Sequence, residues 1–289
     1  MKILIILSVI FIFILIGIFL IKSENRKFRV TEYSYKNKKL KRKLTIAVLS
    51  DLHNYSYGRD NERLLEKLRD IGPDLVISAG DMVEAGRFVK NPRNTVAFLD
   101  RLSQEFTFLY GCGNHEEKLL EGEKYKGLSE EFFRALKEYG GVHPLRNENT
   151  VLEDMGICVY GLSLERDYFK KVILNRTTAE HIEQLVGRPM EEKLNILIGH
   201  NPDQLEAYSD WGADVVLAGH IHGGMIATPW HRGLISPRFI PLPKYDWGKY
   251  EKGKTTMFLS RGLGNHTIHI RIFNRAEIML LKFSGTDSK

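Results

Sequence analysis

The sequence predicts an α/β protein whose mixed sheets pack in layers, with one apolar helix ahead of the folded part. Three observations predict this architecture. Short apolar runs of strand length alternate with amphipathic helical patterns from residue 44 to residue 217. The last third of the chain then consists mainly of strand patterns, which favours a sandwich of mixed sheets. Near the N-terminus, residues 3–21 form a run of 19 residues without a charge.

The apolar run at residues 3–21 predicts a membrane anchor. About 20 apolar residues are needed for a helix to cross the hydrocarbon core of a bilayer. A secretory signal has a shorter apolar run and a small-residue cleavage site, whereas this run continues into Lys22-Ser23-Glu24-Asn25. We therefore expect an uncleaved anchor over residues 1–22 and a single-pass protein of the cell membrane.

Two arguments about the side of the membrane that holds the folded part conflict. Within about 20 residues of the run, one positive residue precedes it and eight follow it, which favours the cytoplasm. A tail of two residues ahead of a first hydrophobic segment is instead typical of proteins that export the part that follows. The orientation stays open at this point.

Residues 23–43 predict a basic linker. Between Lys22 and Lys43 lie ten Lys or Arg residues and two Glu residues, so the rest of the chain is nearly balanced although the formal net charge is +6. Such a stretch is typical of a solvated or membrane-apposed tether, and less often of a nucleic-acid-binding arm. Residues 28–35 alternate weakly, so a peripheral strand is the alternative there. We expect one folded domain over residues 44–284 and a polar tail over residues 285–289.

The elements of the folded domain follow from apolar periodicity and from turn residues. In the pattern at residues 61–71, Leu64, Leu65 and Leu68 share one helical face, and Gly72-Pro73 ends the helix. The expected helices are residues 61–71, 93–102, 129–139, 178–186 and 204–208. The expected strands are residues 44–50, 74–79, 106–110, 194–198 and 214–217, a hairpin-like region through 151–162, and antiparallel strands at 257–260, 267–273 and 277–283.

Five of the apolar runs end on side chains that can hold a metal ion. These side chains are Asp51, His53, Asp81, Asn114, His115, His200, His220 and His222. Open α/β sheets place ligands outside the carboxyl ends of their strands, so the sequence predicts a metal-dependent hydrolytic site there. Asp51 and His53 are two residues apart in an extended chain, so both can point to one ion. Mixed imidazole and carboxylate ligation suits Mn, Fe, Zn or Co better than Mg or Ca.

The same residues carry a resemblance to a known family. In chain order, the motifs are Asp51-x-His53, Gly80-Asp81, Gly113-Asn114-His115-Glu116, Gly199-His200 and Gly219-His220-x-His222. This order resembles the calcineurin-like metallophosphoesterase superfamily over residues 44–283, which implies a four-layer α/β/β/α sandwich of mixed sheets. Residues 220–224 and 261–264 are similar to the membrane-associated branch of YkuE-type and YaeI-type enzymes, which includes UDP-diacylglucosamine pyrophosphatases.

The resemblance implies a binuclear centre of two divalent transition-metal ions. One ion would be held by Asp51, His53, Asp81 and His222, and the other by Asp81, Asn114, His200 and His220. His115 matches a histidine that is not a ligand, stabilises the scissile phosphate and protonates the leaving oxygen. A hydroxide that bridges the ions would attack phosphorus, so no Ser or Cys nucleophile is required. Two positions depart from the branch, since Met225 stands where Gln is usual and Ala276 where Pro is common.

We therefore expect a membrane-anchored phosphoesterase or pyrophosphatase that acts on a phosphate-containing substrate, with lipid-linked and nucleotide-sugar-lipid substrates among the candidates. The alternatives are a nuclease or phosphodiesterase of the same fold and a non-catalytic metal-binding scaffold. Anionic lipid headgroups account for the positive charge beside the anchor, so no specific nucleic acid is expected. No protein partner is evident from the sequence.

Several other residues have two interpretations. The apolar, proline-rich segment at residues 228–250 either shapes substrate recognition or packs over the edge of a sheet. The candidate substrate-binding residues are Trp230, His231 and Arg261. Glu116 is interpreted as a helix N-terminal or surface acid. Cys112 and Cys158 either form one disulfide or remain as buried thiols.

Overall fold

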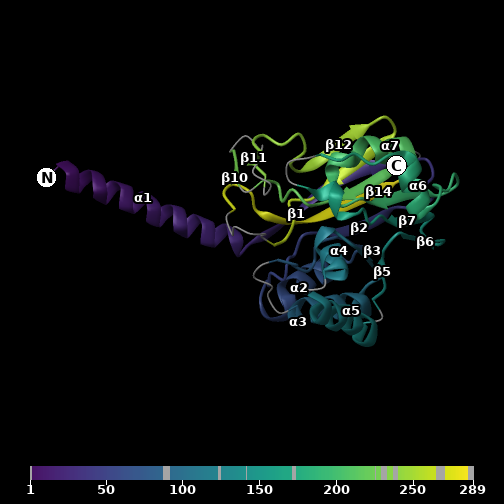
Figure 1. Ribbon diagram of the computed structural model, residues 1–289, viewed down its shortest axis with the longest axis horizontal. Helices are drawn as coiled ribbons and strands as arrows, with labels where there is room; N and C mark the ends of the chain where they lie inside the picture. Colours follow the sequence, from purple (N-terminus) through teal and green to yellow (C-terminus); the bar gives the residue numbers. More distant parts are fainter. Residues whose placement is uncertain are drawn as a thin grey trace.

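The computed structural model describes residues 2–86, 92–122, 125–140, 142–170, 174–224, 226–228, 233–236, 240–264 and 271–285. Within these residues, two six-stranded sheets lie face to face and helices cover their outer faces. Helix α1 (Lys2–Asn25) extends away from this folded part as a long arm, and the end of its last turn lies against the domain (Figure 1).

The first sheet combines a parallel centre with an antiparallel junction near one edge. Its strands, in spatial order, are β1 (Phe28–Lys36), β14 (Ala276–Ser284), β2 (Leu44–Leu49), β3 (Leu75–Ala79), β4 (Phe108–Gly111) and β5 (Pro144–Leu145). Strands β2 to β5 are parallel, so their carboxyl ends share one edge of the sheet. Strand β14 runs antiparallel to β2 and parallel to β1.

The second sheet is parallel at its centre and antiparallel at both edges. Its strands, in spatial order, are β12 (Gly248–Lys252), β13 (Thr255–Leu259), β9 (Val215–Ala218), β8 (Leu194–Ile198), β7 (Ile157–Gly161) and β6 (Glu148–Leu152). The hairpin expected through residues 151–162 is the pair β6 and β7. Strand β13 was expected among antiparallel strands, and it does pair that way with β12, but it runs parallel to β9.

Apolar side chains fill the space between the sheets and the two outer layers. The central core includes Ile46, Ile77, Ile196 and Leu217, which are completely buried. Helices α2 (Glu62–Ile71), α3 (Arg93–Glu105) and α5 (Lys126–Gly140) cover the first sheet, and helices α6 (Ala179–Val186) and α7 (Leu205–Trp211) cover the second. The four-layer α/β/β/α sandwich of mixed sheets is therefore confirmed.

Short elements join these layers and border the carboxyl ends of the strands. They are helix α4 (Asn114–Glu121), the 3-10 turns η1 (Arg59–Asn61), η3 (Arg166–Phe169) and η4 (Pro202–Gln204), and the hairpin strands β10 (Ile226–Ala227) and β11 (Gly233–Ile235). The sequence patterns did not predict α4. Of the strand expected at residues 267–273, residues 267–270 lie outside the described part, and Ile272 forms an isolated bridge to Ile226.

The segment expected as a basic linker contributes a strand to the first sheet. Strand β1 pairs with β14 along its whole length, so the sheet begins at Phe28 and not at Leu44. The hydroxyl of Thr31 donates a hydrogen bond of 2.6 Å to Glu277, and the ring of Tyr35 lies 5.0 Å from that of Phe283. The peripheral strand that was the alternative for residues 28–35 is therefore present, because its apolar side chains cover part of the core.

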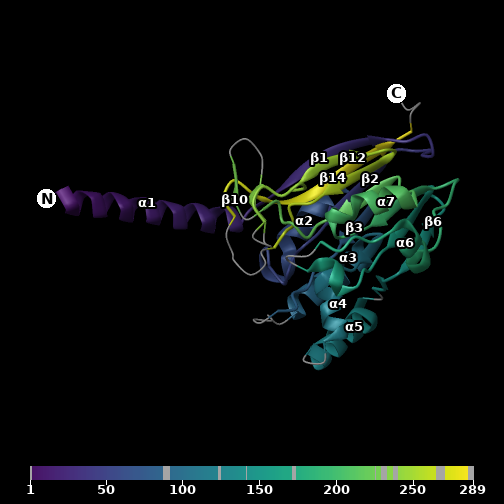
Figure 2. The same ribbon diagram turned by 45° about the horizontal axis from the view of Figure 1, so that its top comes forward.

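The last turn of α1 is fixed to the domain by polar contacts. Arg275 forms an ion pair of 2.6 Å with Glu24, and the hydroxyl of Tyr55 donates to the carbonyl of Asn25 at 2.6 Å. A helical window within Leu7–Asn25 has a mean hydropathy of 2.3 and is not buried in the fold. It is the one described helix long and apolar enough to cross a membrane. Figure 2 shows the same separation of this helix from the two sheets.

The contribution of β1 to the sheet predicts where the chain can be shortened. A chain that starts at Lys27 keeps β1 and should unfold at the same urea concentration as the domain of the full-length protein. A chain that starts at Leu44 loses the Tyr35 contacts and uncovers the edge of β14, which should cost at least about 1.5–3 kcal/mol. Urea unfolding followed by tryptophan fluorescence measures the difference. Equal midpoints for the two shortened chains would contradict this role of β1.

Candidate active site

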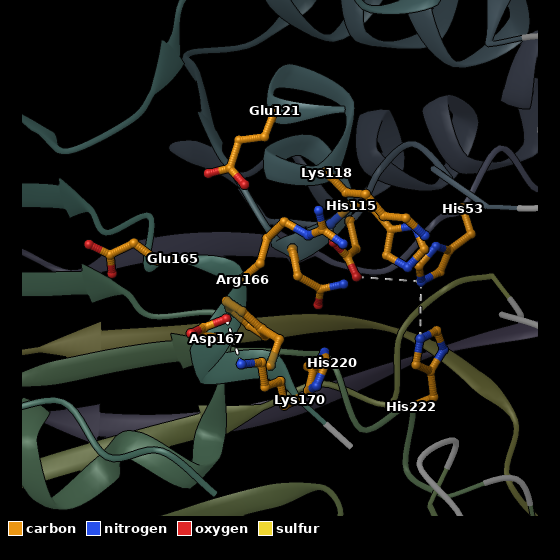
Figure 3. Close-up of a pocket in the computed structure, with 13 residues that line it drawn as sticks. His53, His115, Lys118, Glu121, Glu165, Arg166, Asp167, Lys170, His220 and His222 are labelled. Carbon is orange, nitrogen blue, oxygen red and sulfur yellow. Dashed lines mark hydrogen bonds and ion pairs between the residues drawn. The ribbon is translucent and has the colours of Figure 1, made fainter. Parts of the chain in front are cut away.

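Five strand ends from the two sheets meet at one centre. The first sheet supplies Asp51 and His53 after β2, Asp81 after β3, and Asn114 and His115 after β4, and the second sheet supplies His200 after β8 and His220 and His222 after β9. Figure 3 shows His53, His115, His220 and His222 around one cavity. The convergence that was inferred from strand ends is therefore present in the fold.

The distances within this centre are short, and its carboxylates are buried. His200 Nε2 lies 3.1 Å from Asp81 Oδ2, and His222 Nε2 lies 3.4 Å from Asp51 Oδ1. His53 Nε2 lies 3.1 Å from His222 Nε2 and 3.8 Å from Asp81 Oδ2. Both carboxylates are almost inaccessible to solvent, so positive charge or hydrogen bonds within the centre have to balance them.

The donor atoms form groups of the size that a metal ion requires. The groups whose ligand atoms lie within 4.8 Å of one another are Asp51, His53 and His222, then Asp81, His200 and His220, and then His53, Asp81 and His115. The side-chain oxygen of Asn114 is buried and has no hydrogen-bond partner among the described residues. Carboxylate, imidazole and amide donors therefore fit two divalent transition-metal ions.

Backbone carbonyls orient two of the histidines for ligation. Nδ1 of His200 lies 2.7 Å from the carbonyl oxygen of Ala79, and Nδ1 of His222 lies 3.3 Å from that of Gly264. An acceptor at Nδ1 keeps the proton on that nitrogen and leaves the Nε2 lone pair directed at the centre.

His115 has the opposite arrangement. The backbone N–H of Ala85 donates a hydrogen bond of 2.8 Å to Nδ1 of His115. A backbone amide is always a donor, so Nδ1 accepts and the neutral ring carries its proton on Nε2. Although His115 lies within 4.8 Å of two other donor groups, this tautomer suits a hydrogen-bond donor better than a ligand.

Unusual backbone conformations place the candidate ligands. Asp51, His53, Asp81, His220 and His222 all have positive φ angles, from 48° to 71°. Each such conformation costs on the order of 1–3 kcal/mol for a residue with a side chain, and it persists because surrounding contacts impose it. The backbone N–H of His220 donates to Asp51 Oδ1 at 2.9 Å, and that of His53 donates to the carbonyl of Asp81 at 3.1 Å. Such strain is typical of functional sites.

Two glycines allow the strand ends to approach closely. A side chain at Gly113 would collide with the carboxylate of Asp81, and one at Gly219 would collide with Ser50 and with the carboxylate of Asp51. The glycine that precedes each of these ligand motifs is therefore required by the close contact of neighbouring strand ends.

Glu116 organises the loop that carries Asp81. It is fully buried, and its carboxylate accepts hydrogen bonds of 2.9 Å from the backbone N–H groups of Asp81, Met82 and Gly113. The hydroxyl of Tyr110 donates to it at 2.7 Å. The expected position at a helix N-terminus is correct, but the surface alternative is wrong, because these donors surround the carboxylate. Sequence patterns missed this role, since the donors include the backbone of Asp81 and Met82, which follow another strand.

Burial and neighbouring charges shift the pKa values of the two aspartates in opposite directions. Burial raises the pKa of Asp51 to about 6. Burial also opposes ionisation of Asp81, but the imidazoles of His200 and His115 outweigh it and hold its pKa well below the usual range. Against its own burial, His200 has a pKa raised to about 10 by Asp81. The centre thus stabilises positive charge near Asp81, as expected where cations bind.

A cavity of about 680 Å³ opens onto the centre, and charged side chains line it. Helix α4 contributes Lys118, η3 contributes Arg166 and Phe169, and Lys170 follows η3 directly. Phe169 is the one apolar side chain among the described residues of the lining. Figure 3 shows Arg166 extended into this cavity, whereas Lys170 pairs with Asp167 at 2.9 Å.

The candidate substrate-binding residues from the sequence lie elsewhere or outside the described part. Trp230 and His231 are outside the described residues. Arg261 is buried, its guanidinium lies 3.8 Å from the ring centroid of Trp247, and its Nε lies 3.7 Å from Glu277. It is not among the described residues that line the cavity. Cys112 and Cys158 are free buried thiols, as one of the two interpretations required.

Comparison with known proteins identifies the family. The sequence profile described as Calcineurin-like phosphoesterase matches residues 44–224, which contain all the candidate ligands. The chain belongs to this family. It is therefore a phosphoric ester hydrolase of the metallophosphoesterase type, and the family is one in which two metal ions are generally bound.

Three curated relatives show the branch of the family. The metallophosphoesterase YkuE of Bacillus subtilis is 24% identical over 84% of this chain and 79% of its own length. YpbG of the same organism is 30% identical over 84% of this chain and 82% of its own length. The UDP-2,3-diacylglucosamine pyrophosphatase LpxG of Chlamydia muridarum is 22% identical over 83% of each chain. The resemblance to the YkuE-type branch is therefore confirmed.

The geometry predicts that Asp81 is required for metal binding. Asp81→Asn should lower the metal content from about two ions per chain to one or none while the fold is kept, because its carboxylate contacts donor groups on both sides of the centre. Elemental analysis of the purified protein measures this.

A matched control is Asp74→Asn, since Asp74 precedes the same strand β3 at its opposite end and pairs with Arg42. That variant should keep the metal content of the unchanged protein. Two ions retained in Asp81→Asn would exclude Asp81 as a shared ligand.

Proposed function

We propose that this protein is a membrane-anchored, two-metal phosphoesterase that cleaves a phosphate ester or pyrophosphate bond of an amphiphilic substrate. The observation that carries the proposal is that metal-donor side chains from both sheets meet at one centre, and that His115 lies beside them with the tautomer opposite to that of His200 and His222. A non-catalytic scaffold has no need of the second feature. A charged cavity and an apolar helix next to the domain support the substrate class.

The residues that would hold the ions form two sets. The first set is Asp51, His53, Asp81 and His222, and the second is Asp81, Asn114, His200 and His220. Two divalent ions such as Mn, Fe, Zn or Co would lower the pKa of bound water and neutralise charge on the phosphate oxygens. The Nδ1 atoms of His200 and His222 bind the carbonyls of Ala79 and Gly264, and these contacts keep both rings in the orientation that ligation requires.

His115 would supply the proton donor of the reaction. Its ring lies close to the donor groups of His53 and Asp81, and the Ala85 amide fixes the orientation of that ring. From this position it can donate a hydrogen bond to a phosphoryl oxygen and then protonate the oxygen that leaves.

The cavity suits a headgroup with more than one phosphate. Its volume of about 680 Å³ lies within the range of ligand sites that hold molecules of nucleotide size. Arg166 extends into it, and no ion pair joins Arg166 to another described residue (Figure 3). A guanidinium binds phosphate through two parallel hydrogen bonds, so Arg166 is the side chain that we assign to a second phosphate group.

Two observations support an amphiphilic substrate. The relative LpxG is named for hydrolysis of UDP-2,3-diacylglucosamine, a diphosphate with acyl chains. Helix α1 is long enough to span a bilayer, and its last turn is bonded to the domain through Arg275 and Tyr55. A domain that is attached directly to a membrane-spanning helix can reach lipid headgroups at the membrane surface, and the charged cavity would bind their phosphates.

The role of His115 predicts a dependence on the leaving group. His115→Ala should keep both ions and lose roughly 10²–10⁴-fold in kcat on alkyl phosphates, whose leaving oxygen needs a proton. The loss should be much smaller on p-nitrophenyl esters, whose leaving group departs without one. Steady-state rates on the two substrate types, with metal content as the control, test this. Equal losses on both would assign His115 to phosphate binding alone.

The substrate class predicts the behaviour of Arg166. The full-length protein with Mn should hydrolyse an amphiphilic nucleotide diphosphate faster than a phosphomonoester, a soluble diphosphate or DNA. Arg166→Ala should raise KM for the diphosphate by about 10–100-fold, because it removes a hydrogen bond to a charged group. It should change KM for the monoester little. Steady-state kinetics measure both.

The control variant is Arg176→Ala, an exposed arginine that pairs with Glu206 and does not line this cavity. It should leave both KM values unchanged. Preferred hydrolysis of DNA would instead favour a nuclease, and equal rates on amphiphilic and soluble diphosphates would exclude a preference for lipid-linked substrates.

A further inference from the structure

One short segment of the chain contacts both the helix α1 and the metal-binding centre. In residues 271–275, Arg275 forms the ion pair of 2.6 Å with Glu24 at the end of α1. The neighbouring Asn274 donates through Nδ2 to the carbonyl of His222 at 2.7 Å. The centre is therefore fixed at a short distance from the point where α1 leaves the domain.

This point also marks where a bilayer surface would lie. The uncharged run of α1 ends at Ile21, and Glu24 follows three residues later, about 4.5 Å further along a helix. Tyr55 and Arg63 bond the carbonyls of Asn25 and Arg26, so the helix end does not swing freely against the domain. The face of the domain around these contacts is the one closest to the membrane if α1 spans it.

Three large apolar side chains are exposed on this face. They are Phe273 with 62% of its surface exposed, Leu242 with 68% and Leu234 with 37%. Phe273 adjoins the segment that binds Glu24, and Leu242 has its amide bonded to the carbonyl of Leu234 at 2.9 Å. Phe273 and Leu242 have φ angles of 54° and 45°, conformations that bulky residues rarely adopt.

Backbone contacts join these three residues into one surface. The amide of Ala227 donates to the carbonyl of Ile272, and Ile226 pairs with Ile235 in the hairpin of β10 and β11. Figures 1 and 2 both place β10 beside the end of α1, on the side of the domain from which the helix extends. We refer to Leu234, Leu242 and Phe273 as the apolar rim.

Positive charge borders the end of helix α1. Arg26 and Lys27 follow the helix directly and are exposed, and the exposed Arg63 donates to the carbonyl of Arg26. Exposed apolar side chains bordered by lysine and arginine are typical of surfaces that enter the interface of an anionic bilayer.

We propose that the apolar rim inserts into the headgroup region of the same bilayer that α1 enters, with the basic residues at the helix end against anionic phospholipids. This proposal rests on the membrane anchoring in the proposed function. It adds a second attachment, through which residues 271–275 hold the His222 side of the metal centre at the membrane surface. A substrate whose acyl chains stay in the bilayer would then present its phosphates to the cavity without leaving the membrane.

Fluorescent labelling of single cysteines in the full-length protein tests the proposal. Cys112 and Cys158 are buried, so an introduced cysteine at Phe273→Cys or Leu234→Cys can be labelled selectively with an environment-sensitive dye. Ile12→Cys reports on insertion of α1. Met190→Cys is the matched control, because Met190 is 38% exposed, close to the 37% of Leu234, and lies beyond α6. Vesicles of phosphatidylcholine and phosphatidylglycerol, with and without lipids that carry a quencher, provide the membrane.

The expected result is a blue shift and quenching by the labelled lipids at positions 273, 234 and 12, and neither effect at position 190. Quenching at position 12 alone would keep the anchor and overturn the apolar rim. A blue shift at position 273 without quenching would show that protein, such as a second copy of this chain, covers the rim, and would also overturn the proposal. Quenching at none of the positions would contradict the anchoring itself, so the two failures are distinguishable.

Discussion

Two buried carboxylates among histidines are the constraint on which the rest of this structure depends. Asp51 and Asp81 lie at the carboxyl ends of neighbouring strands and are almost inaccessible to solvent. Buried charges of one sign are tolerated only where positive charge or hydrogen bonds balance them. The strained backbone at five candidate ligands, the glycines that precede the ligand motifs and the buried Glu116 all serve to bring and hold those carboxylates next to imidazoles.

The fold provides this arrangement through its two parallel sheet centres. Because β2, β3 and β4 share one direction, their following residues gather at one edge of the first sheet. Strands β8 and β9 do the same for the second sheet, and the apolar core between the sheets fixes the distance between the two edges. The centre is therefore built from both layers, and each of the two ligand sets that we propose takes residues from both sheets.

The surroundings of the centre divide into a charged side and an apolar side. Helix α4 and η3 border the cavity with charged groups, which suits phosphate recognition. On the side of His222, residues 271–275 connect the centre to the end of α1 and to exposed apolar side chains. An amphiphilic phosphate has the same division between a charged headgroup and an apolar part. This correspondence links the chemistry of the family to the membrane position that we propose for the domain.

The sequence by itself determined the donor set, the alternating elements and the apolar helix, because these depend on local features: side-chain chemistry at strand ends and apolar periodicity. The strand at residues 194–198 and the helix that ends at Ile71 were predicted in this way. Only the tertiary structure decided what depends on contacts between distant residues. Glu116 binds the loop of Asp81, 35 residues away, and Ala85 sets the tautomer of His115. Strand β1 pairs with β14, so Thr31 meets Glu277 across 246 residues, and no local pattern could reveal that pairing.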